Sequence, residues 1–419
     1  MSGTDAVIAF VVAFVVTAAL TPLTARFARR VGAIDRGAPR GLGREATPRL
    51  GGLAILVGVV VGALVALDFS GATQSRMEGI VAGAVIITVV GALDDRFDLP
   101  AGMKLAGQVV AAVIPVASGV EVSNITLPFL GAVDLGNAGA PLTVVGLVLV
   151  MNVVNFSDGI DGLAAGVCAI SGVAFSIIAF DLDRGHAGVL AALTAGAAAG
   201  FLVFNLPPAR VYMGDAGSNL LGLLLGCVAV EGAVKTQAVL ALLFPLVVLA
   251  VPFLDTTFVV LKRVKYRRPV YGADANHFHH RFSRIGFSAK RTVLWLYGWT
   301  ACLAAFAVAL RFVPYSDAGD LDPLWAAVMG AIGLVVLAAS VYVVYVLEIL
   351  KFKRLDAVRL RLVRPGATDA EIQADVEERL ETGEFEAVTP YRGREGREGR
   401  EGRDGRQSAA TPTEPRGPR

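Results

Sequence analysis

Aspartates interrupt long apolar stretches of the sequence at three separate places. Asp94 and Asp95 lie in the segment LDDRFDLP, Asp158 and Asp161 lie in NFSDGIDGL, and Asp215 lies in VYMGDAGS. Carboxylates contributed by separate loops can hold a hard cation such as Mg²⁺ or Mn²⁺, which keeps some water ligands and also takes phosphate oxygens. We therefore expect these five residues to gather around a divalent cation and a phosphorylated compound.

Side chains that can bind phosphate occur in two further segments. Lys104 follows the first acidic pair in GMKLAGQ, and the segment HFHHR contains His277, His279, His280 and Arg281. Lysine and arginine bind phosphate oxygens through charge-assisted hydrogen bonds, and neutral histidines can face anions. The histidines are also candidate zinc ligands, although no cysteine lies near them. Glycine-flanked helix starts in MGDAGS and DGIDG offer backbone N–H groups to anions as well.

A regular spacing places amides and a carboxylate together in the second acidic segment. Asn152, Asn155 and Asp158 occur at intervals of three, so they share one face for as long as the helix continues. Glycines then loosen the backbone. We therefore expect Asp161 to turn toward the same point as Asn155 and Asp158.

The elements that must position these residues are membrane-spanning helices. The chain has 419 residues, 55% hydrophobic and 18% charged, with a mean hydropathy of +0.62, which is too apolar for a soluble domain. By hydropathy, candidate spans lie at 6–23, 51–69, 79–93, 101–117, 141–154, 162–180, 187–205, 216–230, 238–261, 292–313 and 323–350. The sequence therefore predicts an all-α, polytopic integral membrane protein with about eleven transmembrane helices.

The distribution of lysine and arginine predicts the orientation of these helices. Five alternate loops, beginning with residues 24–49, carry eighteen Lys and Arg residues, whereas the other five carry only Arg76, Arg184 and Lys235. Because positively charged loops stay in the cytoplasm, we expect an outer N-terminus, a cytoplasmic C-terminus and a place in the inner (plasma) membrane. The acidic and histidine segments then all lie on the cytoplasmic side, which favours phosphoryl transfer from a cytosolic compound to a lipid phosphate.

Several of these residues also have a purely structural interpretation. Asp215 alone would be explained as an acid at a helix start, the Asp94 segment as a solvated turn, and Lys104 as a side chain that snorkels to the interface. An ion-coupled transporter would also need many spans, but it predicts ionisable residues near the membrane midplane and broken helices in paired halves. The concentration of acids and histidines on one predicted face favours a catalytic site.

Six stretches together resemble the polyprenyl-phosphate N-acetylhexosamine-1-phosphate transferases, bacterial family 4 membrane glycosyltransferases that begin cell-wall and surface-glycan assembly. The stretches are TPRLGG, LDDRFDLPAGMKLAGQ, NFSDGIDGL, PPARVYMGDAGS, PFLDT and HFHHR, and they span residues 46–281 in the family's order. The resemblance implies Mg²⁺-dependent transfer of a sugar-1-phosphate from a UDP-sugar to a polyprenyl phosphate, with release of UMP. It also implies a homodimer, and we expect no nucleic-acid partner.

The resemblance also assigns roles to individual residues. Asp215, Asn155 and Asp158 match the metal ligands, and Asp161 completes the set around the metal and nucleotide. Four acids match the catalytic set: Asp94, Asp95, Asp158 and Asp161. Lys104 resembles a lysine that neutralises phosphate, and the segment with His277, His279, His280 and Arg281 resembles a loop that contacts the sugar nucleotide.

The chemistry of the lipid phosphate bears on the roles of Asp94 and Asp95, which the family places near that phosphate as general base or metal support. A phosphate monoester loses its second proton near pH ~6, so much of it is already a dianion at neutral pH. A strong general base is hardly required. We therefore expect direct attack, without a covalent phosphosugar intermediate on the protein.

Two branches of the family remain as alternatives for the substrate. The branch that transfers phospho-MurNAc-pentapeptide generally has a three-histidine run and a TPTMGG-like stretch, whereas this chain has HFHHR and TPRLGG. Both differences favour the undecaprenyl- or decaprenyl-phosphate GlcNAc-1-phosphate branch. A catalytically inactive scaffold is a third interpretation, but the motif acids, Lys104 and the histidine segment are all present.

The C-terminal part of the chain differs from the apolar part. We expect a transmembrane transferase domain at 1–350 and a cytoplasmic, amphipathic and helical extension at 351–390, with a basic start. A capping box of Thr368 with Glu371 predicts a short helix there. Residues 391–419 are of low complexity and nearly without apolar side chains, so we expect them to be disordered.

Overall fold

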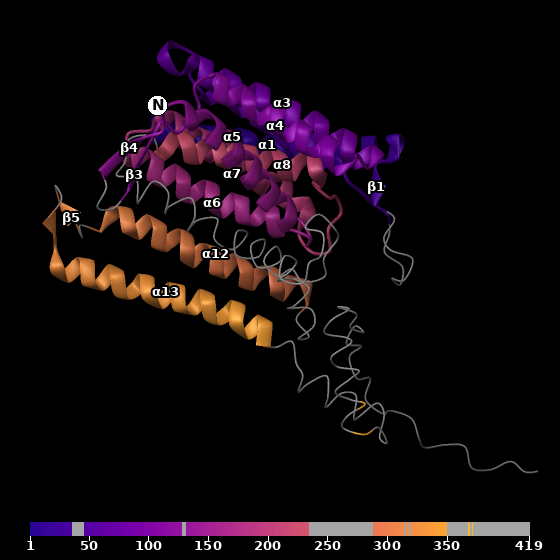
Figure 1. Ribbon diagram of the computed structural model, residues 1–419. Coiled ribbons are helices and arrows are strands. Elements are labelled where there is room, and N and C mark those ends of the chain that lie inside the picture. The colour runs from indigo at the N-terminus through magenta and orange to yellow at the C-terminus, as the bar shows by residue number, and fades with distance from the viewer. Residues whose placement is uncertain are drawn as a thin grey trace, which may run out of the picture. The chain divides into compact units, whose positions relative to one another are not determined.

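The computed structural model describes residues 1–35, 46–127, 131–233, 288–313, 316–317 and 320–349, together with Thr368 and Glu371. It is mostly helical (Figure 1). The α-helices are α1 (Gly3–Val31), α2 (Gly51–Ala66), α3 (Gln74–Phe97), α4 (Ala101–Ala117), α5 (Gly139–Ser157), α6 (Leu163–Asp181), α7 (Gly185–Asn205), α8 (Gly214–Ala233), α12 (Ala289–Phe312) and α13 (Pro323–Ile349). Two 3₁₀ turns, η1 (Gly71–Thr73) and η2 (Gly136–Ala138), precede α3 and α5.

Three short antiparallel sheets of two strands each are an addition to the predicted all-α fold. They pair β1 (Ile34–Asp35) with β2 (Thr47–Pro48), β3 (Asn124–Leu127) with β4 (Gly131–Asp134), and β5 (Ser316–Asp317) with β6 (Asp320–Leu321). In the first sheet Ile34 lies opposite Pro48 and Asp35 opposite Thr47. Hydropathy detects only long apolar runs, so strand pairs this short could not be predicted from it.

The helices confirm a multi-pass membrane protein. Seven helices of the described chain are long and apolar enough to cross a membrane, namely α1, α3, α5 with η2, α6, α7, α12 and α13, while α2 and α4 are shorter apolar helices. Ten of the predicted spans coincide with helices, and the predicted span 238–261 lies outside the described residues. The number of eleven spans and the orientation of the termini therefore stay predictions.

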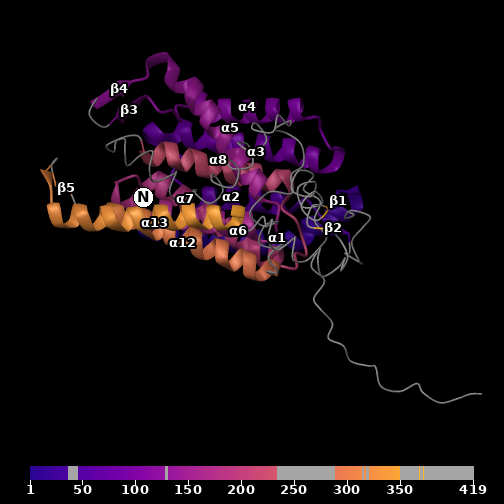
Figure 2. The ribbon, with the colours of Figure 1, turned by 60° about the horizontal axis from the view of Figure 1, so that its bottom comes forward.

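Helix α8 lies at the centre of the bundle and contacts α2, α3, α5, α6 and α7 (Figures 1 and 2). Its leucines are fully buried: Leu220, Leu221, Leu223, Leu224 and Leu225. Glycines allow the close approach, since a Cβ at Gly91 of α3 would lie 2.4 Å from Cα of Ala216, and one at Gly222 of α8 would lie 2.6 Å from Cα of Met151. Small residues at such contacts are typical of helices packed within a membrane.

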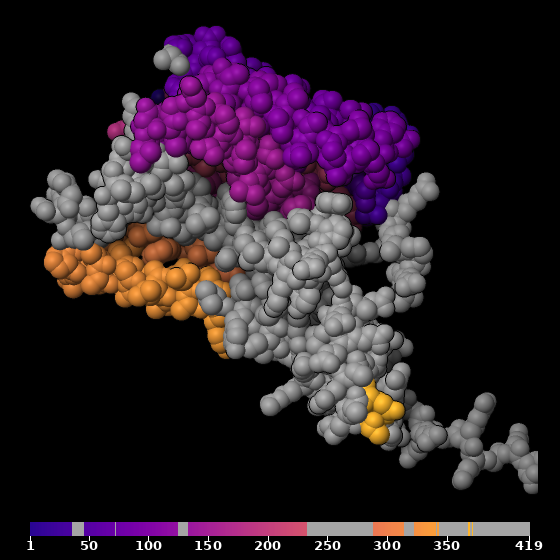
Figure 3. All heavy atoms as spheres, viewed as in Figure 1, coloured from indigo at the N-terminus to yellow at the C-terminus, as the bar shows by residue number. Residues whose placement is uncertain are grey.

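The outer faces of the bundle are apolar, as expected for helices in lipid. Val145 and Leu149 of α5 are exposed, and so are Leu334 and Val335 of α13. Figure 3 shows the surface that α3, α4 and α5 form on the upper side of the view. Exposed apolar area of this kind indicates contact with a membrane.

Short connections bring the polar segments to one end of the bundle. Helix α3 ends and α4 begins there, and the same holds for α5 with α6 and for α7 with α8. The site residues therefore come from helix ends and from the turns between them. Of the C-terminal extension, only the capping box is described. Glu371 N donates to Thr368 Oγ1 (3.5 Å) and Thr368 N donates to Glu371 Oε2 (2.9 Å), which confirms that prediction.

Candidate active site

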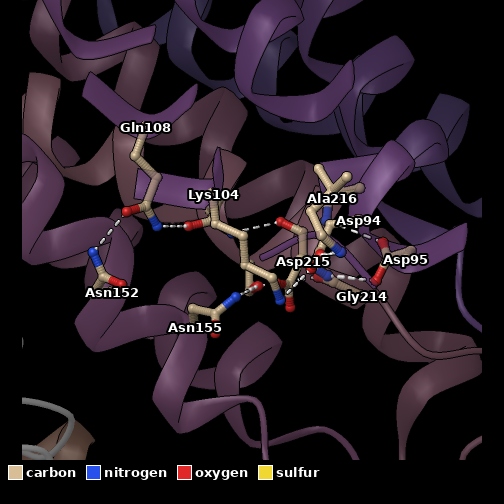
Figure 4. Close-up of polar contacts among 12 residues, drawn as sticks. Asp94, Asp95, Lys104, Gln108, Asn152, Asn155, Gly214, Asp215 and Ala216 are labelled. Carbon is tan, nitrogen blue, oxygen red and sulfur yellow. Dashed lines mark hydrogen bonds and ion pairs between the residues drawn. The ribbon is translucent and has the colours of Figure 1, made fainter. Parts of the chain in front are cut away.

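Lys104 joins two aspartates that lie far apart in the sequence (Figure 4). Its Nζ lies 2.5 Å from Asp94 Oδ2 and 3.2 Å from Asp215 Oδ2. Asp94 is buried and also accepts a hydrogen bond from Leu99 N (2.8 Å). The ends of α3, α4 and α8 therefore meet at one ammonium group. This contact explains the position of Lys104 better than snorkelling does, because the side chain points to one buried and one half-buried carboxylate.

Asp95 holds the first turn of α8. Its Oδ1 accepts a hydrogen bond from Asp215 N (2.9 Å) and its Oδ2 accepts one from Ala216 N (3.2 Å). A carboxylate at a helix N-terminus satisfies free N–H groups and interacts favourably with the helix dipole. Gly214 has a φ of +69°, and a Cβ there would lie 2.2 Å from Asp95 Oδ2. The geometry thus gives Asp95 a positioning contact, and its predicted catalytic role stays a prediction.

The second acidic segment separates into residues with different contacts. Asn155 Nδ2 donates to Ser218 Oγ on α8 (3.0 Å), and Asp158 is the first residue after α5. Asp161 Oδ2 accepts a hydrogen bond from Ala209 N (2.9 Å), so it ties the turn after α5 to the segment before α8. As predicted, Asn155, Asp158 and Asp161 all border the same space.

Asn152 belongs instead to a chain of amides that reaches deeper into the bundle. Asn152 Nδ2 donates to Gln108 Oε1 (2.9 Å), Gln108 Nε2 donates to Asn219 Oδ1 (2.8 Å), and Asn219 Nδ2 donates to the Asp215 carbonyl (2.8 Å). Gln108 and Asn219 are buried. The chain connects α5, α4 and α8 directly behind the acidic residues, one helix turn deeper than Asn155.

A cavity of ≈ 370 Å³ lies beside these residues. Eight charged or amide side chains line it: Asp35, Arg49, Asp95, Asn155, Asp158, Asp161, Asn205 and Asp215. Tyr212 and three residues of the two turns complete the lining. Carboxylates thus outnumber cations in the cavity wall, and an anionic reactant needs added positive charge to bind there.

The donor set suits a hard cation in part. Within the described residues, no group of three or more His, Cys, Asp or Glu side chains is arranged to hold a metal ion. Mg²⁺ usually takes one or two protein carboxylates and completes its shell with water and substrate phosphate. Asp158 and Asp215, with the Asn155 amide oxygen, can supply that smaller set.

The state of Asp158 supports this fit. Partial burial, and after it the charge of nearby carboxylates, foremost Asp215, raise the pKa of Asp158 well above its usual range. Its carboxylate has no hydrogen-bond or ion-pair partner in the part of the chain that the structure describes. A divalent cation would relieve both the repulsion and the missing partner.

Sequence reasoning missed three contributors to the site. Arg49 pairs with Asp35 across the cavity wall, with Nη2 and Oδ2 3.0 Å apart. Asn205, at the end of α7, accepts a hydrogen bond from Gly162 N and donates one to the Val211 carbonyl, both 2.9 Å long. The TPRLGG stretch was a signal for Arg49, whereas Asn205 ends an apolar run and gave none.

Five residues of interest lie outside the described residues. They are Asp255, the aspartate of the PFLDT stretch, and the predicted nucleotide-binding set of His277, His279, His280 and Arg281. Their assignment to the site stays a prediction from the resemblance.

Fold and site together define a multi-pass helical membrane protein with an acid-rich polar pocket at one end of its helices. Residues 77–233 match the model of glycosyl transferase family 4. The chain is 35% identical over 292 residues to a protein of Bacillus subtilis named probable undecaprenyl-phosphate N-acetylglucosaminyl 1-phosphate transferase, with 70% of this chain and 81% of that protein covered. The chain belongs to glycosyl transferase family 4.

Other relatives carry two different names. A decaprenyl-phosphate N-acetylglucosaminephosphotransferase of Mycobacterium leprae is 34% identical over 327 residues, covering 72% of this chain and 82% of that protein. A phospho-N-acetylmuramoyl-pentapeptide-transferase of Desulforudis audaxviator is 33% identical over 331 residues, covering 71% of this chain and 95% of that protein. Both branches that the sequence left open are therefore represented among the relatives.

Proposed function

We propose that the protein transfers GlcNAc-1-phosphate from UDP-GlcNAc to a membrane polyprenyl phosphate and releases UMP. In this reaction a lipid phosphate oxygen attacks the β-phosphorus of the nucleotide sugar, and the bond from that phosphorus to the oxygen bridging the two phosphates breaks. The electron pair leaves with UMP. The names of the relatives at about 35% identity support the GlcNAc branch.

The observation that carries the proposal is the contact of Lys104 with Asp94 and Asp215 beside the acidic cavity. Phosphoryl transfer depends mainly on position and on neutralised charge. An ammonium held between two carboxylates from different helices is a fixed positive centre, and it lies where a phosphate oxygen can replace one of its partners.

Direct attack suits the contacts of Asp94. Each of its two carboxylate oxygens already has a donor, Lys104 at Oδ2 and Leu99 N at Oδ1, which fixes the carboxylate against Lys104. Since the lipid phosphate is mostly a dianion at neutral pH, Asp94 serves to orient Lys104. Asp95 holds the start of α8 in place. Asn155 and Asp158 lie at the end of α5 and bind the metal ion.

We infer that Mg²⁺, or Mn²⁺, is held by Asp215 and Asp158 with Asn155. When bound, such an ion neutralises charge on the transferred phosphoryl group and on the leaving UMP. The protein residues fix the position of the ligand oxygens. His277, His279, His280 and Arg281 are proposed to contact the nucleotide sugar.

We also propose that the site opens to the cytoplasm of a cell with the protein in its inner membrane. The excess of Lys and Arg in the loops at this end of the helices supports that orientation. The proposed homodimer is a separate prediction, and the mass of the purified protein in detergent tests it.

The test is release of UMP by the purified protein in detergent with a polyprenyl phosphate and Mg²⁺. UDP-GlcNAc, other UDP-sugars and UDP-MurNAc-pentapeptide are supplied in turn. We expect UMP from UDP-GlcNAc, and none when Asp215→Ala replaces the wild type or when a chelator removes the metal. Release of UMP only from UDP-MurNAc-pentapeptide would select the other branch, and no release from any donor would refute a transferase function.

A further inference from the structure

Arg49 is a cation in a wall made mostly of carboxylates. It follows β2 directly, and its Nη2 lies 3.0 Å from Asp35 Oδ2 at the end of β1. Both side chains are 35% exposed and line the cavity. Among the described residues that line the cavity, Arg49 is the one lysine, arginine or histidine. Lys104 is not part of this lining, although it contacts Asp215, which is.

The backbone around Arg49 is held by hydrogen bonds on both sides. Arg49 N donates to the Ala33 carbonyl (3.1 Å). On the other side Tyr212 N donates to the Pro48 carbonyl (2.8 Å), and Gly51 N donates to the Tyr212 carbonyl (3.0 Å). The residue thus follows a two-stranded sheet, and backbone hydrogen bonds on both sides hold its Cα in place.

The same stretch connects Arg49 to the acidic start of α8. Gly52 N donates to the Met213 carbonyl (2.9 Å), two residues before Asp215. A Cβ at Gly52 would lie 2.2 Å from the backbone nitrogen of Gly217, so only glycine permits this approach. Arg49 and Asp215 therefore keep a constant separation, as two groups that bind one ligand must.

Asp35 orients the Arg49 guanidinium without occupying all of its hydrogen-bond donors. It has five N–H donors in a planar fork, and Asp35 is the described partner of one end of it. In the part of the chain that the structure describes, the other donors have no partner, so they can bind an anion in the cavity. Arginine forks match phosphate oxygens geometrically, and such charge-assisted hydrogen bonds are among the strongest in proteins.

The surroundings of Lys104 and Arg49 differ, and the difference indicates which phosphorylated reactant each cation contacts. Lys104 is flanked by Met103 and Leu105, which are 58% and 51% exposed on α4 and therefore border lipid. Arg49 follows a strand pair outside the apolar helices and is preceded and followed by half-buried or buried residues. These surroundings favour Lys104 as the partner of a lipid phosphate and Arg49 as the partner of a water-soluble anion.

We propose that Arg49 binds the diphosphate of the nucleotide sugar and that Asp35 positions its guanidinium. This inference rests on the proposed function, because it assigns one of the two phosphorylated reactants to the Arg49 side of the cavity.

The test compares Arg49→Gln, Arg49→Lys and Asp35→Asn with the wild type. Initial rates are measured against UDP-GlcNAc at saturating polyprenyl phosphate, and then with the two reactants exchanged. Loss of a charge-assisted hydrogen bond predicts a rise of about ten- to hundredfold in KM for UDP-GlcNAc in Arg49→Gln, with KM for polyprenyl phosphate unchanged. Arg49→Lys keeps the positive charge but loses the planar guanidinium with its paired N–H donors. Asp35→Asn keeps the guanidinium but removes the ion pair that orients it. Both variants should therefore raise KM for UDP-GlcNAc less than Arg49→Gln does.

Arg29→Gln is the matched control, since Arg29 is an exposed arginine at the end of α1 and its loss changes the net charge equally. It should leave both KM values unchanged. An unchanged KM for UDP-GlcNAc in Arg49→Gln, or an equal rise for both reactants, would overturn the assignment.

A binding measurement separates this inference from the proposed reaction. Titration calorimetry with UDP-GlcNAc and Mg²⁺, without lipid, should show weaker binding by Arg49→Gln than by wild type even if no UMP is formed. Equal binding by the two proteins would refute the role of Arg49 whatever the activity. If Arg49→Gln fails to fold, Arg49→Lys and Asp35→Asn carry the same comparison.

Discussion

Replacing Asn205 by leucine should separate the two loops that build the cavity. The Asn205 side chain is 1% exposed and bonds to Gly162 N and to the Val211 carbonyl. Leucine has a similar size but can make neither bond. Each buried group left without a partner costs about 1–3 kcal/mol, so the total is about 2–6 kcal/mol.

The lower end of that range already predicts a large effect on catalysis. If the folded protein absorbs about 2 kcal/mol by moving the loops apart, the properly aligned fraction falls roughly 30-fold, because about 1.4 kcal/mol corresponds to a factor of ten. We expect UMP release at saturating substrate to fall by that factor or more, with a lower melting temperature in detergent.

The assay is UMP release together with a thermal melt for wild type, Asn205→Leu and a control. Asn137→Leu is the control, because Asn137 is exposed in η2 and far along the chain from the site loops. It should behave as wild type in both measurements. An Asn205→Leu variant with the wild-type rate would refute the idea that this amide holds the loops in register.

Three further perturbations test other parts of the structure. Gly52→Ala places a Cβ 2.2 Å from a backbone nitrogen of α8, so it should cost about 1–3 kcal/mol or more of stability. Both the melting temperature and the activity should fall. Gly146→Ala is the control, because a Cβ there meets open space, and it should change neither. Arg76→Met leaves buried Glu231 without its ion-pair partner (3.1 Å) and should destabilise the folded protein by about 3–5 kcal/mol. Adding Glu231→Gln should restore part of this stability. A double variant as unstable as Arg76→Met alone would contradict this explanation. Because the pKa of Asp158 is raised, its neutral form stabilises the metal-free fold at low pH, and that stability is lost as pH rises through the raised pKa. Mg²⁺ competes with this proton, so its effect on the melting temperature should grow with pH in wild type and not in Asp158→Asn.

Much of the helical framework could be predicted from hydropathy, because each long apolar run must form a helix to satisfy its backbone in lipid. The gathering of Asp94, Asp158 and Asp215 at one end also followed, since short connections return successive helices to the same side. The contact of Asp95 with α8 could not be predicted. It joins residues 120 positions apart, and an aspartate that caps a distant helix has the same sequence signature as one that binds metal.

Helix ends were equally hard to interpret from sequence. Asn205 follows a continuous apolar run, and its importance comes only from the two backbone groups on either side of it. The spacing places Asn152 on the face of Asn155, but it does not reveal that the partner of Asn152 is Gln108 of α4. Tertiary neighbours, which local spacing does not specify, decided both cases.

The buried amide chain of Asn152, Gln108 and Asn219 limits how the bundle can move. Sliding α4 past α8 by a single turn, about 5.4 Å, would break the link from Gln108 to Asn219, and sliding α5 past α4 would break the link from Asn152 to Gln108. Either movement would leave amides unpaired in an apolar interior. An alternating-access cycle needs such displacements of one bundle against another. The amide contacts therefore keep α4, α5 and α8 in fixed relative positions. The reactants must bind, react and leave without a large movement of these helices.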